Sequence, residues 1–234
     1  MERSFGFEKG KNMARSKNAA KPRDATVLLG SALAPNLRNK PYPPGRIKIA
    51  RAFISLLEQK EFNAITTAEI ARNAGVTEAL IYKYFADKRG LLHQVLEEYL
   101  EQFLVQFELD LKGIKGALNK VRKLIWSHIH VYANNRVFAK ILFLEVRNHL
   151  DYYNSETYGL VKDYSKILLD IIEEGVRDGE IRDDIPVKLI RQVVFGSIEH
   201  VCLTSVIFRR EISPDELTED LCKFIFSGIE RKQP

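Results

Sequence analysis

The segment from Thr66 to Leu92, TTAEIARNAGVTEALIYKYFADKRGLL, constrains this chain more than any other. It predicts two short helices around a tight turn, with Thr67 at the N-cap of the first helix and Gly75, which tolerates a positive φ, closing it. Thr77 is placed to cap a second helix that runs to about Phe85. This is the pattern of a helix-turn-helix, whose second helix enters the major groove of DNA while the first crosses the backbone.

The same segment resembles the DNA-binding module of the tetracycline-repressor (TetR) family. The residues that match the family pattern, all in one register, are Thr66, Ile70, Ala71, Ala74, Gly75, Val76, Thr77, Ile81, Tyr82, Tyr84, Phe85, Lys88, Leu91 and Leu92. So many matches in one register are far more specific than a short motif. The resemblance implies an all-α fold, in which a three-helix helix-turn-helix head is joined by a long fourth helix to a helical body that binds a ligand and dimerises.

The chain divides into three parts by composition and periodicity. Residues 1–44 are basic and interrupted by prolines, so we expect an unstructured N-terminal extension, and the sequence leaves open whether Met13 is the true start or the extension touches DNA phosphates. We expect the DNA-binding head at residues 45–92 and the ligand-binding and dimerisation body at residues 93–234. The helices predicted from apolar periodicity are at residues 46–59, 87–111, 114–134, 136–150, 154–178, 186–209 and 213–231.

The net charge of +5 is unevenly distributed. Residues 1–39 hold 8 Lys/Arg against 3 Asp/Glu and residues 40–90 hold 9 against 5, so the remainder carries −4. A basic N-terminal part on an acidic remainder suits a nucleic-acid-binding end joined to a regulatory end. The alternative is an ordinary solvated surface with a basic tail.

Cysteine usage and hydropathy indicate a cytoplasmic protein. The two cysteines, Cys202 and Cys222, lie in apolar helical contexts and suggest buried thiols rather than a disulfide framework. We find neither an apolar run long enough to span a membrane nor an apolar leader, so we expect no membrane partner.

The resemblance places the contacts to double-stranded DNA on and around the second helix of the motif. The implied contact residues are Thr67, Thr77, Glu78, Ala79, Tyr82, Lys83, Tyr84 and Lys88. Lys83 and Lys88 suit phosphates or base edges, whereas Ile81 and Phe85 are assigned to the core. Glu78 is unlike the small or basic residues often found at its position; it either accepts from a cytosine amino group or only caps its helix, so the operator cannot be read.

Aromatic residues crowd the predicted body, where core packing is the default and a ligand tunnel is the alternative. The candidate lining residues are Trp126, Phe138, Phe143, Arg147 and Phe195. We find no spacing typical of a metal site and no nucleophile placed beside a base, so we expect no metal, no cofactor and no enzyme.

The last two predicted helices are apolar on more than one face, which a single neighbour cannot cover. In the family these helices form a four-helix interface between two subunits, and the alternative is the core of a monomer. The residues predicted for a homodimer interface are Val194, Ile198, Val201, Cys202, Leu221 and Ile225.

Two function classes follow. The first is a ligand-responsive repressor that binds a palindromic operator as a homodimer; the second is a helical interaction module that does not read sequence. The segment from Gly179 to Val201 is similar to TetR-family regulators of fatty-acid metabolism, which respond to long-chain acyl-CoA. A regulator of efflux that responds to diverse hydrophobic compounds is the alternative within the first class.

Overall fold

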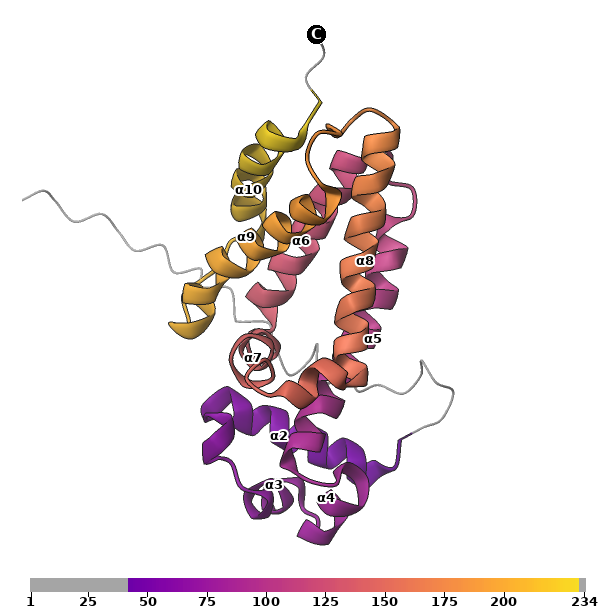
Figure 1. The fold of residues 1–234 in the computed structure, drawn as a ribbon. Helices are drawn as coiled ribbons and strands as arrows, with labels where there is room; N and C mark the ends of the chain where they lie inside the picture. Colours follow the sequence, from indigo (N-terminus) through magenta and orange to yellow (C-terminus); the bar gives the residue numbers. More distant parts are fainter. Residues whose placement is uncertain (1–41, 232–234) are drawn as a thin grey trace, which may run out of the picture.

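The computed structural model describes residues 42–231, and these residues fold into a head and a larger body stacked end to end (Figure 1). The prediction of an all-α fold is confirmed: the only β pairing within residues 42–231 is an isolated bridge between Ile181 and Glu230. The α-helices are α2 (Pro44–Gln59), α3 (Thr67–Ala74), α4 (Glu78–Phe85), α5 (Lys88–Leu111), α6 (Ala117–Asn134), α7 (Arg136–Lys140), α8 (Glu156–Arg177), α9 (Val187–Ile207) and α10 (Pro214–Ile229). The expected extension at residues 1–44 lies outside the described residues, apart from its last three positions.

The head packs α2, α3 and α4 around a small apolar core. Ile49, Phe53 and Ile70 are completely buried there. Ile81 and Phe85 point into the same core, as the helical spacing predicts. The remaining face of α4 is left on the outside of the head, where it is available to a partner.

The N-terminus of α3 differs by one residue from the prediction. The hydroxyl of Thr66 accepts the backbone N–H of Glu69 at 3.2 Å, so Thr66 is the N-cap and Thr67 is the first helical residue. The side chain of Thr67 is therefore free to bond across the turn. Gly75 ends the helix with a φ of 64°, as predicted.

A sharp corner joins α4 to α5. Ala86 has a φ of 62°, and the carboxylate of Asp87 then caps α5 by accepting the N–H of Gly90 at 2.6 Å. A Cβ atom at position 90 would lie 2.0 Å from the carbonyl oxygen of Phe85, so only glycine fits. The first turn of α5 therefore packs directly on the last turn of α4.

The long helix α5 belongs to both parts of the molecule (Figure 1). Its first turns bury Leu91 and Leu92 in the head, and Phe107, near its other end, is buried in the body. The predicted boundaries of this helix, 87–111, agree with the structure to within one residue. α5 therefore joins the core of the head to the core of the body.

The body is a layered helical bundle with α6 at its centre. α6 contacts α8, α9 and α10, and α8 packs along α5 (Figure 1). The buried residues of these helices form one continuous apolar core with the head.

The helix predicted at residues 136–150 is not continuous. α7 ends at Lys140 and is followed by a π-helical turn at Ile141–Glu145 and a 3₁₀ helix at Leu150–Asn154. Three consecutive side chains, those of Ile141, Leu142 and Phe143, are buried. These three residues lie in the π turn, a local irregularity that apolar periodicity alone does not predict.

Candidate DNA-binding surface and internal cavity

Three polar side chains join α3 to α4 on the outer face of the head. The hydroxyl of Thr67 donates to the carboxylate of Glu78. The hydroxyl of Tyr82 lies 3.4 Å from the Thr67 hydroxyl and 3.5 Å from the same Glu78 oxygen. Tyr82 is 51% exposed, so this cluster displays hydrogen-bonding groups at the surface.

Other residues that the family resemblance assigns to DNA share this surface. Ala79 and Lys83 are exposed, and Tyr84 is half-buried. Thr77 is exposed and begins α4 without a capping bond from its side chain. The first backbone amides of α4 therefore remain available to an acceptor such as a phosphate oxygen. The contacts of all these residues with DNA stay predictions.

Lys88, a predicted phosphate contact, has hydrogen-bonding partners within the head. Its ammonium donates to the backbone carbonyls of Phe62 at 2.8 Å and Ile65 at 2.6 Å. Burial, together with the nearby charge of Arg89, lowers the pKa of Lys88. The side chain fastens the loop before α3 to the start of α5, and its contact with DNA stays a prediction.

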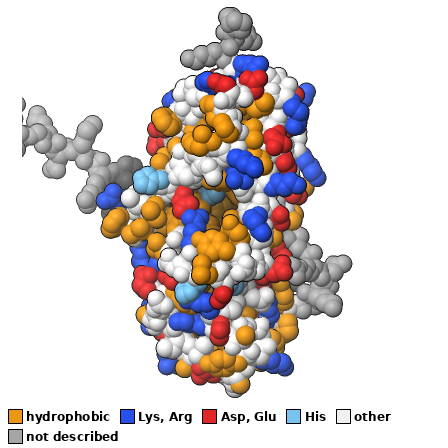
Figure 2. Space-filling view, viewed as in Figure 1, with side chains coloured by type: hydrophobic (Ala, Val, Ile, Leu, Met, Phe, Trp, Pro, Cys, Tyr) orange, Lys and Arg blue, Asp and Glu red, His pale blue; other side chains and the backbone are white. Residues whose placement is uncertain are grey.

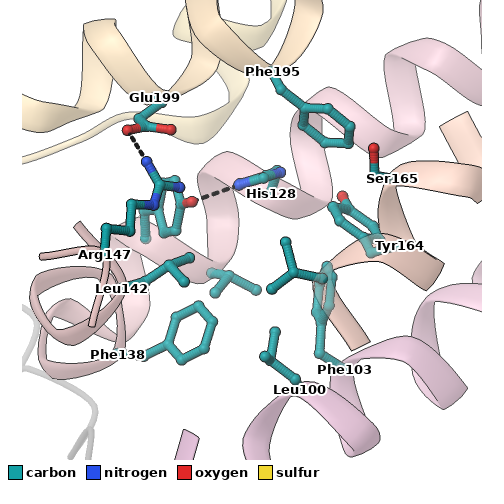
Figure 3. Close-up of a pocket in the computed structure, with 13 residues that line it drawn as sticks. Leu100, Phe103, His128, Phe138, Leu142, Arg147, Tyr164, Ser165, Phe195 and Glu199 are labelled. Atoms are coloured by element: carbon teal, nitrogen blue, oxygen red, sulfur yellow. Dashed lines mark hydrogen bonds and ion pairs between the residues drawn. The ribbon is translucent and has the colours of Figure 1, made fainter. Parts of the chain in front are cut away.

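A cavity of about 190 Å³ lies inside the body, enclosed by α5, α6, α8 and α9 with the segment that follows α6 (Figure 3). Its apolar lining consists of Leu100, Phe103, Val131, Phe138, Leu142, Val161 and Phe195. Its polar lining consists of His128, Tyr132, Arg147, Tyr164, Ser165 and Glu199. The surface of the body is hollowed in the space-filling view, with acidic and basic side chains beside the hollow (Figure 2).

Three of the five predicted lining residues, Phe138, Arg147 and Phe195, do line the cavity. The prediction is wrong for Trp126, whose indole N–H donates to Asp215 of α10 at 2.7 Å, outside the cavity. It is also wrong for Phe143, which packs edge-on against another ring behind the cavity wall. Aromatic content alone could not separate the two sides of α6.

Sequence reasoning missed the polar residues of the cavity wall. His128 and Tyr132 are four residues apart on α6 and therefore share one face, and the Nε2 atom of His128 lies 2.6 Å from the Tyr132 hydroxyl. Two polar rings at this spacing on an otherwise apolar helix face were the available signal.

An ion pair lies at the edge of the cavity and affects the pKa values of the groups around it. The guanidinium of Arg147 donates to the carboxylate of Glu199 on α9 (Figure 3). Burial opposes the charge on Arg147, but Glu199 more than compensates and raises the pKa of the guanidinium. Burial, and then the charge of Arg147, lower the pKa of His128 to about 3, so the imidazole is neutral at physiological pH.

Most of the residues predicted for the dimer interface lie inside the body of the single chain. Five of its six residues, Val194, Ile198, Cys202, Leu221 and Ile225, are buried in the chain's own core. Val201 alone is exposed. The apolar residues that α9, its C-terminal end and α10 leave exposed are Leu189, Val193, Val201, Ile207, Phe208 and Phe224. α9 is apolar on two faces, and the sequence does not show which of them packs against the body of the same chain.

Length and composition alone would let α9 cross a membrane, contrary to the sequence expectation. Its buried face, however, packs against α6 and α8 of the body. A core helix of a globular bundle passes the same test.

Two family models match this chain. The model for bacterial regulatory proteins of the tetR family matches residues 49–95, and the model for the C-terminal region of YsiA-like proteins matches residues 96–228. The chain is 28% identical over 189 residues to the fatty acid metabolism regulator protein of Bacillus subtilis (strain 168), covering 81% of this chain and 97% of that one. It is 22% identical to the HTH-type transcriptional repressor KstR2 of Mycolicibacterium smegmatis, covering 86% and 98%.

Solved structures show the same likeness. The transcriptional regulator FadR from Bacillus subtilis, crystallised in complex with stearoyl-CoA, superposes with a TM-score of 0.71 at 28% identity, covering 78% of this chain and 98% of that one. FadR from Bacillus halodurans has a TM-score of 0.72 at 20% identity, covering 82% and 100%, which supports the fold alone. With the two family models spanning its head and its body, the chain belongs to the tetR family of bacterial transcriptional regulators.

Proposed function

We propose that this regulator is a repressor that binds a palindromic operator as a homodimer and releases it when a long-chain acyl-CoA enters the body. The observation that carries the proposal is the apolar cavity between α5, α6, α8 and α9, with one ion pair at its edge. A relative of similar fold was crystallised with stearoyl-CoA. Such a protein acts on DNA in the cytoplasm.

The exposed face of α4 supports the DNA-binding part of the proposal. The contact set is the sequence-derived one without Lys88, whose ammonium already donates to two backbone carbonyls of the head. It comprises Thr67, Thr77, Glu78, Ala79, Tyr82, Lys83 and Tyr84. Phosphate contacts would position the head, and side chains of α4 would read base edges in the major groove.

The exposed apolar stripe supports the homodimer. Leu189, Val193 and Val201 recur on the outer face of α9, and Phe224 of α10 is 72% exposed. A two-fold pairing of these helices would cover both copies of the stripe with one self-complementary interface. It would also present two copies of α4 to successive major grooves, about 34–36 Å apart.

The size of the cavity supports a switch. At about 190 Å³ it is smaller than the roughly 300–1,000 Å³ of sites for drug-sized ligands, so a long acyl chain must move the cavity walls apart. α5 supplies Leu100 and Phe103 to this wall and Leu91 to the head core. Displacement of α5 would therefore change the spacing of the two heads.

Basic side chains lie near the cavity. Lys162 and Lys166 are exposed on α8, beside the lining residues Val161 and Ser165, where they suit the phosphates of coenzyme A.

The binding energy of a long acyl chain is large enough for a switch. Shifting a population from 99:1 to 1:99 requires about 5.5 kcal/mol of differential binding. Burying a methylene contributes about 0.8 kcal/mol, so a long chain supplies more than this in gross terms.

The test is a titration of acyl-CoA thioesters of increasing chain length against a labelled duplex that the protein has selected from random sequences. Release whose potency rises with chain length supports the proposal. Release by unrelated hydrophobic compounds with equal potency would favour the efflux regulator instead. If unrelated duplex competes as well as the selected one, the protein is an interaction module that does not read sequence.

A further inference from the structure

Two polar atoms in the cavity wall lack a hydrogen-bonding partner. Within residues 42–231, neither the hydroxyl of Tyr164 nor the Nδ1 atom of His128 makes a hydrogen bond, and both atoms are buried. Both residues line the cavity. Buried polar groups in folded proteins are nearly always hydrogen-bonded, so two unpaired polar atoms in one wall require an explanation.

The two unpaired atoms lie close together, on helices that face each other. The ring centres of His128 and Tyr164 are 5.5 Å apart, and each lies within 5.7 Å of the centre of the Phe195 ring. Figure 3 shows the Tyr164 hydroxyl directed between His128, Phe195 and Ser165. They form a polar notch (His128, Tyr164 and Ser165) in a cavity whose remaining wall is largely apolar.

The hydrogen-bonding capacity of the notch is defined. One nitrogen of the His128 ring is occupied by Tyr132 at 2.6 Å, which leaves Nδ1 as the free one. Burial raises the pKa of Tyr164 well above its ordinary value, so its hydroxyl keeps its proton. The Tyr164 hydroxyl donates one hydrogen bond, and Nδ1 either donates or accepts another, depending on the tautomer.

A saturated hydrocarbon chain cannot satisfy this notch. Methylene groups packed against it would leave both polar atoms without partners, so a saturated chain forgoes the hydrogen bonds that an oxygenated chain could make there. A hydroxyl or ketone oxygen on the chain would accept from the Tyr164 hydroxyl, and a hydroxyl would also pair with Nδ1 of His128. Resting on the function proposed above, we infer that the preferred effector is an oxygenated acyl thioester, with a hydroxyl or ketone oxygen at the chain position that meets His128 and Tyr164.

The experiment compares stearoyl-CoA with isomers of hydroxystearoyl-CoA that move the hydroxyl along the chain. The measurement is the concentration of each thioester that releases half of the selected duplex. We expect one narrow range of hydroxyl positions to be about tenfold more potent than the saturated thioester, with other positions weaker than it. This comparison uses the unaltered protein and needs no variant to fold.

Two variants assign the preference to the notch. Tyr164→Phe removes only the hydroxyl and should abolish the preference, so that the favoured isomer is no more potent than stearoyl-CoA on the same variant. Tyr158→Phe removes a hydroxyl from the same helix outside the cavity and should leave the preference intact.

The outcomes separate this inference from the function on which it rests. Equal potency of saturated and hydroxylated chains at every position, or a preference that survives Tyr164→Phe, overturns the inference and leaves acyl-CoA control standing. Failure of every thioester to release the duplex overturns both.

Discussion

The guanidinium of Arg46 on α2 lies 2.5 Å from the carboxylate of Glu98 on α5, and both side chains are only 9% exposed. The same guanidinium donates to the side-chain carbonyl of Gln94 at 2.6 Å and lies 3.7 Å from the centre of the Tyr42 ring. This buried pair links the first helix of the head to the helix that enters the body. Burial raises the pKa of Glu98, although Arg46 opposes the shift.

Removal of one partner should cost more than removal of both. Arg46→Met leaves Glu98 buried without a counter-ion and should lower the free energy of unfolding by about 3 kcal/mol. Arg46→Met combined with Glu98→Leu should recover most of that loss. Urea unfolding of the parent, both single variants and the double variant measures the coupling. Additive losses in the double variant would mean that the pair is not coupled.

The Arg46→Met defect should also depend on pH. A buried carboxylate with a raised pKa binds its proton more tightly in the folded state than in the unfolded state. Proton binding therefore adds to the free energy of unfolding at low pH, and this contribution is lost as pH rises through the folded-state pKa. Without Arg46 the shift is larger, and the defect should therefore be greater at pH 7.5 than at pH 5. Urea midpoints at the two pH values check this, with the parent as control. An equal defect at both values would show that Glu98 is not the group responsible.

Two lysines of the head should behave differently on DNA. Lys83 is exposed on α4, so Lys83→Ala should weaken binding on all duplexes and reduce the slope of log affinity against log salt by about 0.9. Lys88→Ala should leave that slope unchanged and lower the melting temperature, because the ammonium holds two backbone carbonyls. Fluorescence anisotropy at several salt concentrations distinguishes the two. A reduced slope for Lys88→Ala would restore it as a phosphate ligand.

Charges on the two faces of α9 should have separate effects. Val193 is 45% exposed, so Val193→Asp should give a folded monomer that has lost tight binding to a palindromic duplex. Ile198 is completely buried, so Ile198→Asp should unfold the body rather than dissociate a dimer. Sedimentation velocity and circular dichroism separate the outcomes. A dimeric Val193→Asp variant would place the interface elsewhere.

Filling the cavity should weaken binding of the effector without affecting DNA binding. Phe195→Trp adds volume to the cavity wall and should raise the acyl-CoA concentration needed for release by about tenfold or more, which corresponds to about 1.4 kcal/mol of lost binding. Trp126 lies outside the cavity, where its indole bonds to Asp215, so Trp126→Phe is the matched control. Release assays on one selected duplex compare the two variants. Equal responses would place the acyl site outside this cavity.

Local sequence patterns were sufficient to predict most of the helical structure of the head. Gly75, the apolar spacing of α3 and α4, and the cap at Asp87 act within a few residues of one another, so a sequence pattern contains them completely. The intramolecular partners of Lys88 were not predictable, because the carbonyls of Phe62 and Ile65 come from a preceding loop whose backbone path no local pattern specifies.

The body was predictable as helices but not as surfaces. Both faces of α9 are apolar, and periodicity cannot say that Val194 turns inward while Val193 turns outward; the neighbouring helices decide this. The same limit applies to Trp126, which a helix distant in sequence draws away from the cavity. His128 and Tyr164 are recognisable as a polar notch only after folding, because α6 and α8 bring them together from separate segments.

The glycine at the corner between α4 and α5 has a mechanical consequence. With the carbonyl of Phe85 occupying the space of a Cβ atom at position 90, a larger residue there would force the first turn of α5 away from the last turn of α4. Because only Ala86 and Asp87 separate the two helices, few residues are available to absorb a displacement of α5 before it reaches α4. In the function proposed above, the stiffness of this corner would set how much of a ligand-induced movement of α5 reaches α4.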